Sequence, residues 1–248
     1  GLPLMVMFNT TIFTDNYHAL SDLVRFFIDQ SDVVGLASFQ LQADTGRGEV
    51  RGRPDCISLE SARNLISLGA GSELPWDVIL VGHPKCQSYL PALAVNGKAF
   101  GLIDDPNLFA GFLREFSDVM HDRRQSTPAI AWSYFKVMLL KPRWLLKALG
   151  YVLTRLWFIR GDFWAARGKV RPITLMVKNF MHADHLDQER VDACAFMVMT
   201  PDGPMSMCAH NAKRDEHILR PLEIETDSGP ETFYSLSSNK TLIKDSVA

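Results

Sequence analysis

The sequence lacks closely spaced cysteines and the short motifs that identify several large enzyme classes. Its 248 residues include four cysteines, and no two of them form a Cys-x-x-Cys pair, which would be a far stronger sign of a metal site. No G-x-S-x-G, P-loop or G-x-G-x-x-G segment occurs. A serine hydrolase, a P-loop kinase and a dinucleotide-binding fold therefore have no support in the sequence.

The chain also has little net charge and no leader signal. Its formal net charge of -2 argues against a nucleic-acid partner. The N-terminus has neither the basic segment nor the small-residue cleavage site of a signal peptide. Four cysteines without close pairing do not form a secreted disulfide framework, so we expect a cytoplasmic protein. Because the sequence starts without Met and directly in an apolar run, we expect it to be part of a longer protein.

The first 41 residues carry the pattern of a βαβ unit. Apolar runs at Leu2–Phe8 and Val33–Leu41 are typical of strands buried on both faces, and Tyr17–Ile28 has apolar residues at helical spacing. Such units give parallel neighbouring strands. Asn9 and Gln40 come where these strands are expected to end, which is where α/β folds bind ligands. The alternative is that the two side chains cap strands or bond a loop.

The middle of the sequence predicts a helix, a strand and a hairpin. Ile57–Leu68 has the pattern of a helix, and Asp77–Val81 that of a short strand. Asn96-Gly97, between two apolar runs, is a strong signal for a two-residue hairpin turn. Asp104-Asp105-Pro106 then predicts the start of a helix, because Pro is well tolerated in the first turn.

Two cysteines flank a second predicted hairpin near the C-terminus. Cys194 precedes an apolar run that reaches the turn Thr200-Pro201-Asp202-Gly203, and Cys208 follows the return strand. Pro and Gly are typical of such turns. A hairpin brings its two ends together, so both sulfurs are expected at one end of it, within reach of a shared metal or cluster. The alternative is that both cysteines are ordinary core residues.

Three segments together resemble part of a known enzyme family. They are Pro84-Lys85-Cys86-Gln87-Ser88, Asn96 to Phe116, and Cys194 to Asn211, and the span from the first to the last of them is about half of the chain. Their order is similar to the C-terminal two-thirds of a group of radical S-adenosylmethionine (SAM) enzymes. That group includes the archaeal tetraether-lipid synthases and their bacterial relatives.

The resemblance implies an α/β fold built on a partial (β/α) barrel. Residues 1–126 would be the second half of that barrel, residues 127–170 an amphipathic helical segment, and residues 171–248 a small α+β module that binds a cluster. Asn9 and Gln40 would face SAM. The family's Cys-x-x-x-Cys-x-x-Cys signature is absent from this sequence, so the chain would not be competent alone.

The resemblance also implies an auxiliary [4Fe–4S] cluster held by Cys86, Cys194 and Cys208. Fe–S clusters are bound by cysteine thiolates, usually four, with occasional replacement by histidine. Three possibilities remain for the fourth ligand: Cys56, a histidine such as His83 or His210, or no protein ligand at all. Zinc is the alternative metal, because three cysteines and one histidine form a regular tetrahedral zinc set.

Residues 127–169 combine apolar and basic residues to an unusual degree. The segment holds eight Lys and Arg against one acid, Asp162, and four of the five tryptophans. Pro142 predicts two helices rather than one, and the charges break the run too often for a transmembrane span. One interpretation is a buried helical pair whose cations reach the surface. The other is a pair that lies in a membrane interface, with its cations on anionic headgroups. It predicts an exposed apolar face bordered by Lys136, Lys141, Arg143, Lys147 and Arg155.

These observations lead to two hypotheses for the function. In the first, the chain is the C-terminal portion of a radical SAM iron–sulfur oxidoreductase or transferase that acts on a small molecule, a lipid or another hydrophobic substrate. In the second, it is a non-catalytic binding module, stabilised by zinc or an Fe–S cluster, at a membrane surface. Both place the protein in the cytoplasm, with peripheral membrane contact through residues 127–169.

Overall fold

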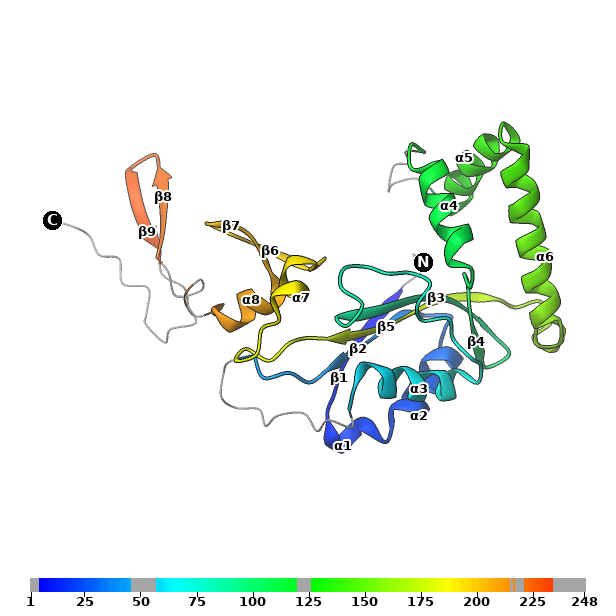
Figure 1. Cartoon of the computed structure of the whole chain (residues 1–248), viewed down its shortest axis with the longest axis horizontal. Coiled ribbons are helices and arrows are strands. Elements are labelled where there is room, and N and C mark those ends of the chain that lie inside the picture. Colours follow the sequence, from blue (N-terminus) through cyan, green and yellow to red (C-terminus); the bar gives the residue numbers. More distant parts are fainter. Residues whose placement is uncertain (1–4, 46–56, 120–125, 215, 217–220, 234–248) are drawn as a thin grey trace.

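The chain folds around a five-stranded mixed sheet with helices on one of its faces (Figure 1). The computed structural model describes residues 5–45, 57–119, 126–214, 216 and 221–233. The strands of the sheet are β1 (Val6–Ile12), β2 (Val34–Leu41), β3 (Gln87–Val95), β4 (Lys98–Gly101) and β5 (Arg171–Asn179). Their order is β1-β2-β5-β3-β4; β1, β2 and β5 are parallel, and β3 runs antiparallel to β5 and β4. The predicted α/β class is therefore confirmed.

Two helices cover one face of the sheet and form the main core with it. They are α2 (Leu20–Asp29) and α3 (Leu59–Ala70), and the four-residue α1 (Thr14–Tyr17) precedes them. In α2, the buried residues recur at helical spacing and point into the sheet; they are Leu20, Val24, Phe27 and Ile28. Phe27 contacts Phe39 of β2, with ring centroids 6.1 Å apart.

The N-terminal strand differs from its prediction in length and in burial. Within the described part of the expected Leu2–Phe8 run, Met7 is 69% exposed, because β1 lies at the edge of the sheet and no helix covers that face. The strand also continues past Phe8 to Ile12, pairing with β2 as far as Leu41. The expectation of burial on both faces is wrong for β1. The parallel pairing of β1 and β2 is confirmed.

The middle segment confirms the hairpin and corrects one strand. β3 and β4 are joined at Asn96 and Gly97, both with positive φ, and Asp105 caps α4 (Pro106–Phe116) by accepting hydrogen bonds from two backbone amides. The predicted strand Asp77–Val81 is wrong. Those residues form turns, and Val81 is exposed.

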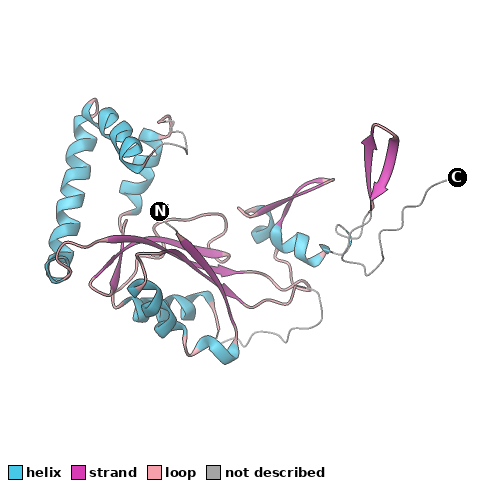
Figure 2. Ribbon diagram, turned by 180° about the vertical axis from the view of Figure 1, so that it is seen from behind, coloured by secondary structure: helices cyan, strands magenta, loops and turns pink. Residues whose placement is uncertain are grey.

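Two long helices rise from the end of the sheet as an arm (Figures 1 and 2). The helical arm consists of α5 (Thr127–Leu139) and α6 (Pro142–Ala165), so the predicted break at Pro142 is confirmed. Ile159 of α6 is buried against Val95 and Phe100 of the β3–β4 hairpin. The arm is therefore fixed to the sheet through the C-terminal half of α6.

Strand β5 returns the chain from the arm to the middle of the sheet. The sheet thus takes strands from both the 1–126 and the 171–248 segments. Within the described ranges, β1 and β4 each pair with one strand, so the sheet is open and a partial barrel is not established. The chain continues through α7 (Gln188–Asp192), β6 (Met197–Thr200), β7 (Gly203–Ser206), α8 (Met207–Ala212), β8 (Leu222–Thr226) and β9 (Gly229–Phe233).

The contrast between the covered and the uncovered face generates a stability prediction. Phe39 is fully buried beneath α2, whereas Met7 lies on the opposite face and is exposed. We expect Phe39→Ala to lower the free energy of unfolding by about 3–5 kcal/mol, because it leaves a cavity in the core. Met7→Ala should change it by less than about 0.5 kcal/mol. Denaturant unfolding of the two variants checks this, and equal losses would contradict the assigned faces.

Candidate functional site

Three cysteines from separate segments line one small cavity, named here the cysteine cavity. Cys86 directly precedes β3, Cys194 follows α7, and Cys208 lies in the first turn of α8. Strands β6 and β7 form the predicted hairpin, and Cys194 and Cys208 flank it. The three cysteines thus line one cavity, and a shared metal at their sulfurs stays a prediction. The cavity is lined further by Lys178, Asn179, Phe180, Met181, Arg190, Phe196 and Ser206.

Each sulfur of the cavity contacts a polar group of the protein. The Arg190 Nε–H donates to the Cys86 sulfur at 3.2 Å, and its Nη2 donates to the Asn179 carbonyl at 2.6 Å. The Cys194 thiol donates to the Phe196 carbonyl at 3.1 Å. The Cys208 sulfur accepts from the Met181 amide at 3.5 Å. These contacts hold all three sulfurs near the cavity without a bond between them.

The lining of the cysteine cavity carries positive charge and no carboxylate. Its two cations are Lys178 and Arg190. Burial lowers the pKa of the Lys178 amine, and its Nζ lies 4.5 Å from the centroid of the Phe196 ring. Burial also raises the pKa of the Cys208 thiol, and the neighbouring thiols of Cys194 and Cys86 act in the same direction. The two cations of the lining favour an occupant that carries negative charge, whereas burial favours the protonated thiol of Cys208.

The donor chemistry of the cavity suits a thiolate-bound metal, but the sulfurs do not form a closed ligand set. Among the residues that the structure describes, no three His, Cys, Asp or Glu side chains are grouped closely enough to hold a metal ion. Neither His83 nor His210 lines the cavity; the buried His83 ring accepts from the Lys85 amide at 3.2 Å. Cys56 lies outside the described residues. A metal would thus require the cysteine side chains to turn from their present partners.

Asn9 and Gln40 lie together on the uncovered face of the sheet. The Asn9 Nδ2 is 3.5 Å from the Gln40 Oε1. Gln40 is near the end of β2, as expected, but Asn9 lies in the middle of β1 because that strand continues to Ile12. Ser38, the register partner of Asn9, is buried, and its hydroxyl has no hydrogen-bond partner among the described residues. This face therefore presents the side chains of Asn9 and Gln40, with the buried Ser38 hydroxyl next to them.

The outer side of the helical arm is a large exposed apolar surface. Leu140 is 83% exposed, Trp157 70% and Trp164 77%. This surface, named here the apolar face, comprises Trp132, Phe135, Leu139, Leu140, Leu146, Leu149, Leu153, Leu156, Trp157 and Trp164. Exposed apolar patches of this kind are typical of interaction sites rather than of free surface. The interpretation as a buried helical pair is wrong for these side chains.

The cations of the arm divide between the apolar face and the sheet. Lys136, Arg143 and Lys147 are exposed beside the apolar face, in line with the prediction. Arg155 is not, because it turns to the sheet and pairs with Asp104. Lys141 is engaged as well, since its Nζ lies 2.9 Å from the Glu115 carboxylate.

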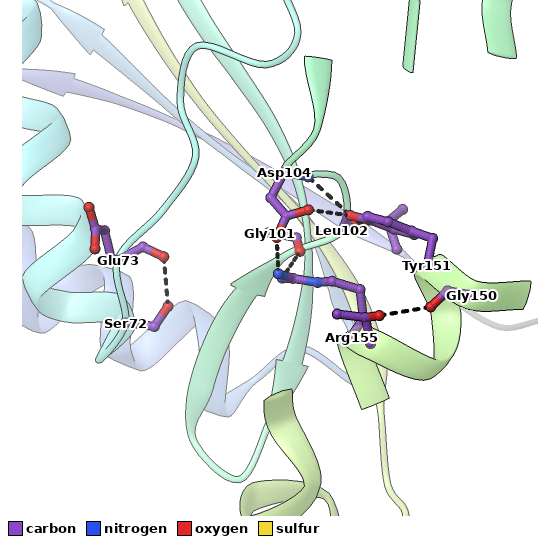
Figure 3. Close-up of polar contacts among 9 residues, drawn as sticks. Ser72, Glu73, Gly101, Leu102, Asp104, Gly150, Tyr151 and Arg155 are labelled. Atoms are coloured by element: carbon purple, nitrogen blue, oxygen red, sulfur yellow. Dashed lines mark hydrogen bonds and ion pairs between the residues drawn. The ribbon is translucent and has the colours of Figure 1, made fainter. Parts of the chain in front are cut away.

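A polar cluster on the inner side of α6 fastens the arm to the sheet (Figure 3). The Tyr151 hydroxyl lies 2.8 Å from the Asp104 Oδ1 and accepts from the Asp104 amide. Arg155 pairs with the same carboxylate and donates to the Gly101 carbonyl at 2.6 Å. These residues line an open cavity of about 500 Å³ between α6 and the β4 end of the sheet. Their polar groups form hydrogen bonds and an ion pair with one another, so the cluster attaches the arm to the sheet.

Several residues of the site escaped prediction from the sequence. Arg190 lies four positions before Cys194, but the sulfur that it contacts is that of Cys86, 104 positions away. Lys178 reaches the cavity from the end of β5. The only sequence signal for Lys178 was its position directly after an apolar strand run, and Arg190 had none. No protein-family model matches this sequence, and no curated protein matches it either.

Of the helices within the described residues, none is both long enough and apolar enough to cross a membrane.

Tyr151 provides a pH-dependent test of the arm's attachment. Burial, reinforced by the Asp104 side chain, raises the pKa of Tyr151 from 10.0 to about 12. The folded protein thus favours the protonated phenol. The contribution to stability is complete below about pH 10 and is lost as the pH rises towards 12. A tyrosinate absorbance titration of wild type minus Tyr151→Phe should give a midpoint near 12. A midpoint at the ordinary value would contradict the attachment.

Proposed function

We propose that this chain is the C-terminal portion of a radical SAM iron–sulfur oxidoreductase or transferase that works at a membrane surface. Its substrate would be a lipid or another hydrophobic molecule. The observation that carries the proposal is the meeting of Cys86, Cys194 and Cys208 at one cavity. The three cysteines are separated by as much as 122 positions in the sequence, and soft thiolates are the ligands that Fe–S clusters require.

The residues around the cavity match an auxiliary [4Fe–4S] cluster in charge and in hydrogen bonding, but the cavity measures about 20 Å³ and would have to open to admit one. Cys86, Cys194 and Cys208 would hold it, and such a cluster supplies one-electron chemistry when bound. The positive charges of Lys178 and Arg190 offset the negative charge of the thiolates. The Arg190 Nε–H and the Met181 amide already donate to two of the sulfurs, and hydrogen bonds of this type tune a metal centre.

The uncovered face of the sheet is the proposed place for SAM. Asn9 and Gln40 would bind polar groups of the cofactor, and the unused Ser38 hydroxyl lies beside them. On this proposal the parallel strands β1, β2 and β5 belong to a partial (β/α) barrel. The Cys-x-x-x-Cys-x-x-Cys segment that cleaves SAM would lie elsewhere in a longer protein.

The apolar face supports the membrane part of the proposal. Its leucines and tryptophans would enter the boundary between headgroups and acyl chains, where an indole has an apolar body and a polar N–H. Lys136, Arg143 and Lys147 would face anionic headgroups, each worth about 1 kcal/mol. The protein would therefore be cytoplasmic and peripherally bound, with its hydrophobic substrate drawn from the membrane.

A second candidate function is a non-catalytic, metal-stabilised module at the same surface. It is favoured by the absence of the Cys-x-x-x-Cys-x-x-Cys signature from the sequence. In that case zinc would occupy the cysteine cavity, with a fourth ligand supplied by histidine or water. The identity of the bound metal separates the two candidates.

Anaerobic reconstitution with iron and sulfide tests the cluster directly. We expect bound iron and acid-labile sulfide with the absorption of an Fe–S cluster, because the cavity offers three thiolates. Cys86→Ala, Cys194→Ala and Cys208→Ala should each abolish most of the binding, and Arg190→Gln should weaken it by about tenfold. Iron and zinc are quantified per chain by mass spectrometry.

The matched control is Cys56→Ala, the same change at the remaining cysteine. This variant should retain the metal if Cys56 is not a ligand. Loss of the metal from this variant would identify Cys56 as the fourth ligand. Stoichiometric zinc without any iron–sulfide centre would support the second candidate. Wild-type protein that binds neither metal would refute both.

Flotation with liposomes tests the membrane contact. Wild-type protein should float with vesicles that contain anionic lipid, and added salt should weaken the binding because Coulombic attraction is screened. Leu153→Ser/Trp157→Ser should lose most of it, since burying each of these side chains contributes about 1.5–3 kcal/mol. The control, Leu113→Ser, changes an exposed leucine on α4, outside the apolar face. Failure of wild type to float at low salt would contradict the proposal.

A further inference from the structure

We propose that the turn between α5 and α6 holds a binding site for the headgroup of a phosphomonoester lipid. This inference rests on the membrane contact proposed above and assigns it a specific lipid chemistry. The site is an open cavity of about 460 Å³, named here the corner pocket. It is lined by Glu115, Lys141, Pro142, Arg143, Trp144 and Lys147.

The charges of the corner pocket are unbalanced in favour of an anion. Its single carboxylate, Glu115, is taken up by Lys141, whose Nζ also donates to the Glu115 carbonyl and lies 5.2 Å from the centroid of the Phe116 ring. Arg143 and Lys147 are exposed, and neither forms an ion pair with a described residue. Two positive charges at one cavity therefore remain available to a ligand.

The wall of the pocket keeps one of these cations, Lys147, in place. Trp144 is half-buried, packed edge-on against Phe116 with ring centroids 5.8 Å apart, and close to Gly111 of α4. The Lys147 Nζ lies 5.0 Å from the centroid of the Trp144 ring. Because Trp144 is fixed by α4, the amine of Lys147 is held at the rim of the pocket rather than free in solvent.

The pocket adjoins the apolar face, and this adjacency selects a lipid as the occupant. Leu146, Leu153 and Trp157 recur at helical spacing along α6, and Arg143 and Lys147 fall beside that stripe at its N-terminal end. A lipid whose acyl chains lie along the leucines brings its headgroup to the corner pocket. A soluble anion would leave the apolar face uncovered.

The number and type of the cations favour a phosphomonoester over a singly charged headgroup. A phosphomonoester carries about -1.5 to -2 charges at neutral pH, which matches the two available cations. The guanidinium of Arg143 can also bind two phosphate oxygens in parallel. A phosphodiester or a carboxylate headgroup offers less charge to the same pair.

The test compares two vesicle types of equal surface charge. One contains phosphatidylcholine with phosphatidic acid, the other phosphatidylcholine with enough phosphatidylserine to match its zeta potential. Wild-type protein should bind the phosphatidic acid vesicles several-fold more tightly. Arg143→Gln/Lys147→Gln should lose this preference and about tenfold or more of its binding to them.

The matched control removes the same charge away from the pocket. Lys136→Gln/Arg160→Gln changes two exposed cations on α5 and on the second half of α6, and neither residue lines the corner pocket. This variant should bind both vesicle types more weakly by the same factor and keep the preference for phosphatidic acid. Circular dichroism of both variants verifies that the helices are retained.

Three outcomes would overturn the inference, and they are distinguishable. Equal binding of wild type to both vesicle types, or equal behaviour of the two double variants, refutes the headgroup site while leaving the membrane contact intact. Failure to float on either vesicle type refutes the membrane contact itself. Thermal stabilisation by glycerol phosphate without vesicles, lost in Arg143→Gln/Lys147→Gln, would mean that the pocket takes a soluble phosphate ester instead of a lipid.

Discussion

The insertion of β5 between β2 and β3 is the constraint on which the rest of the molecule depends. Its side chains Ile173, Leu175 and Val177 are buried in the core beneath the sheet, so the register of β5 is fixed by the burial of one face. That register places Lys178 opposite Gln87. The backbone amide of Asn179 donates to the backbone carbonyl of Cys86 at 2.7 Å. The cysteine cavity therefore forms where β5 leaves the sheet. A shift by one residue would turn Lys178 into the core and remove a cation from the cavity.

The same strand links two surfaces that the sequence keeps far apart. Gln40 is the register partner of Lys178, so the polar residues on the uncovered face and the cysteine cavity meet at the end of β5. The helical arm leaves at the other end of the strand, where Ile159 packs on the hairpin. The uncovered face and the cysteine cavity are thus connected structurally through β5. The arm therefore lies away from both of these surfaces.

Local patterns predicted the local structure of this chain well, and the long-range pairing less well. The turns at Asn96-Gly97 and at Pro201-Asp202 follow from backbone chemistry within a few residues, and so does the break at Pro142. The position of β1 at an edge was not predictable, because an apolar run such as Met5–Phe8 looks alike in an edge strand and a central one. Arg190 beside Cys86 was equally hidden, since 104 residues separate the pair. Arg155 faces the sheet instead of bordering the apolar face because its partner, Asp104, lies 51 positions away in the loop between β4 and α4.

The charge content of the helical arm also gives the molecule an electrical direction. Residues 127–169 carry eight cations and one acid, a net +7, so the other residues together carry -9 to give the overall -2. The single acid of the arm, Asp162, is bound by Asn96 and Lys98 of the hairpin, and the Asn96 contact lowers its pKa. The chain is consequently a strong dipole despite its small net charge. Near a negatively charged surface it experiences a torque that turns the arm towards that surface before contact. This torque acts within about one Debye length, ~10 Å. Encounters with such a surface would be oriented by its electric field. The sheet, with the cysteine cavity and the polar residues of its uncovered face, would be held away from the surface and open to solvent.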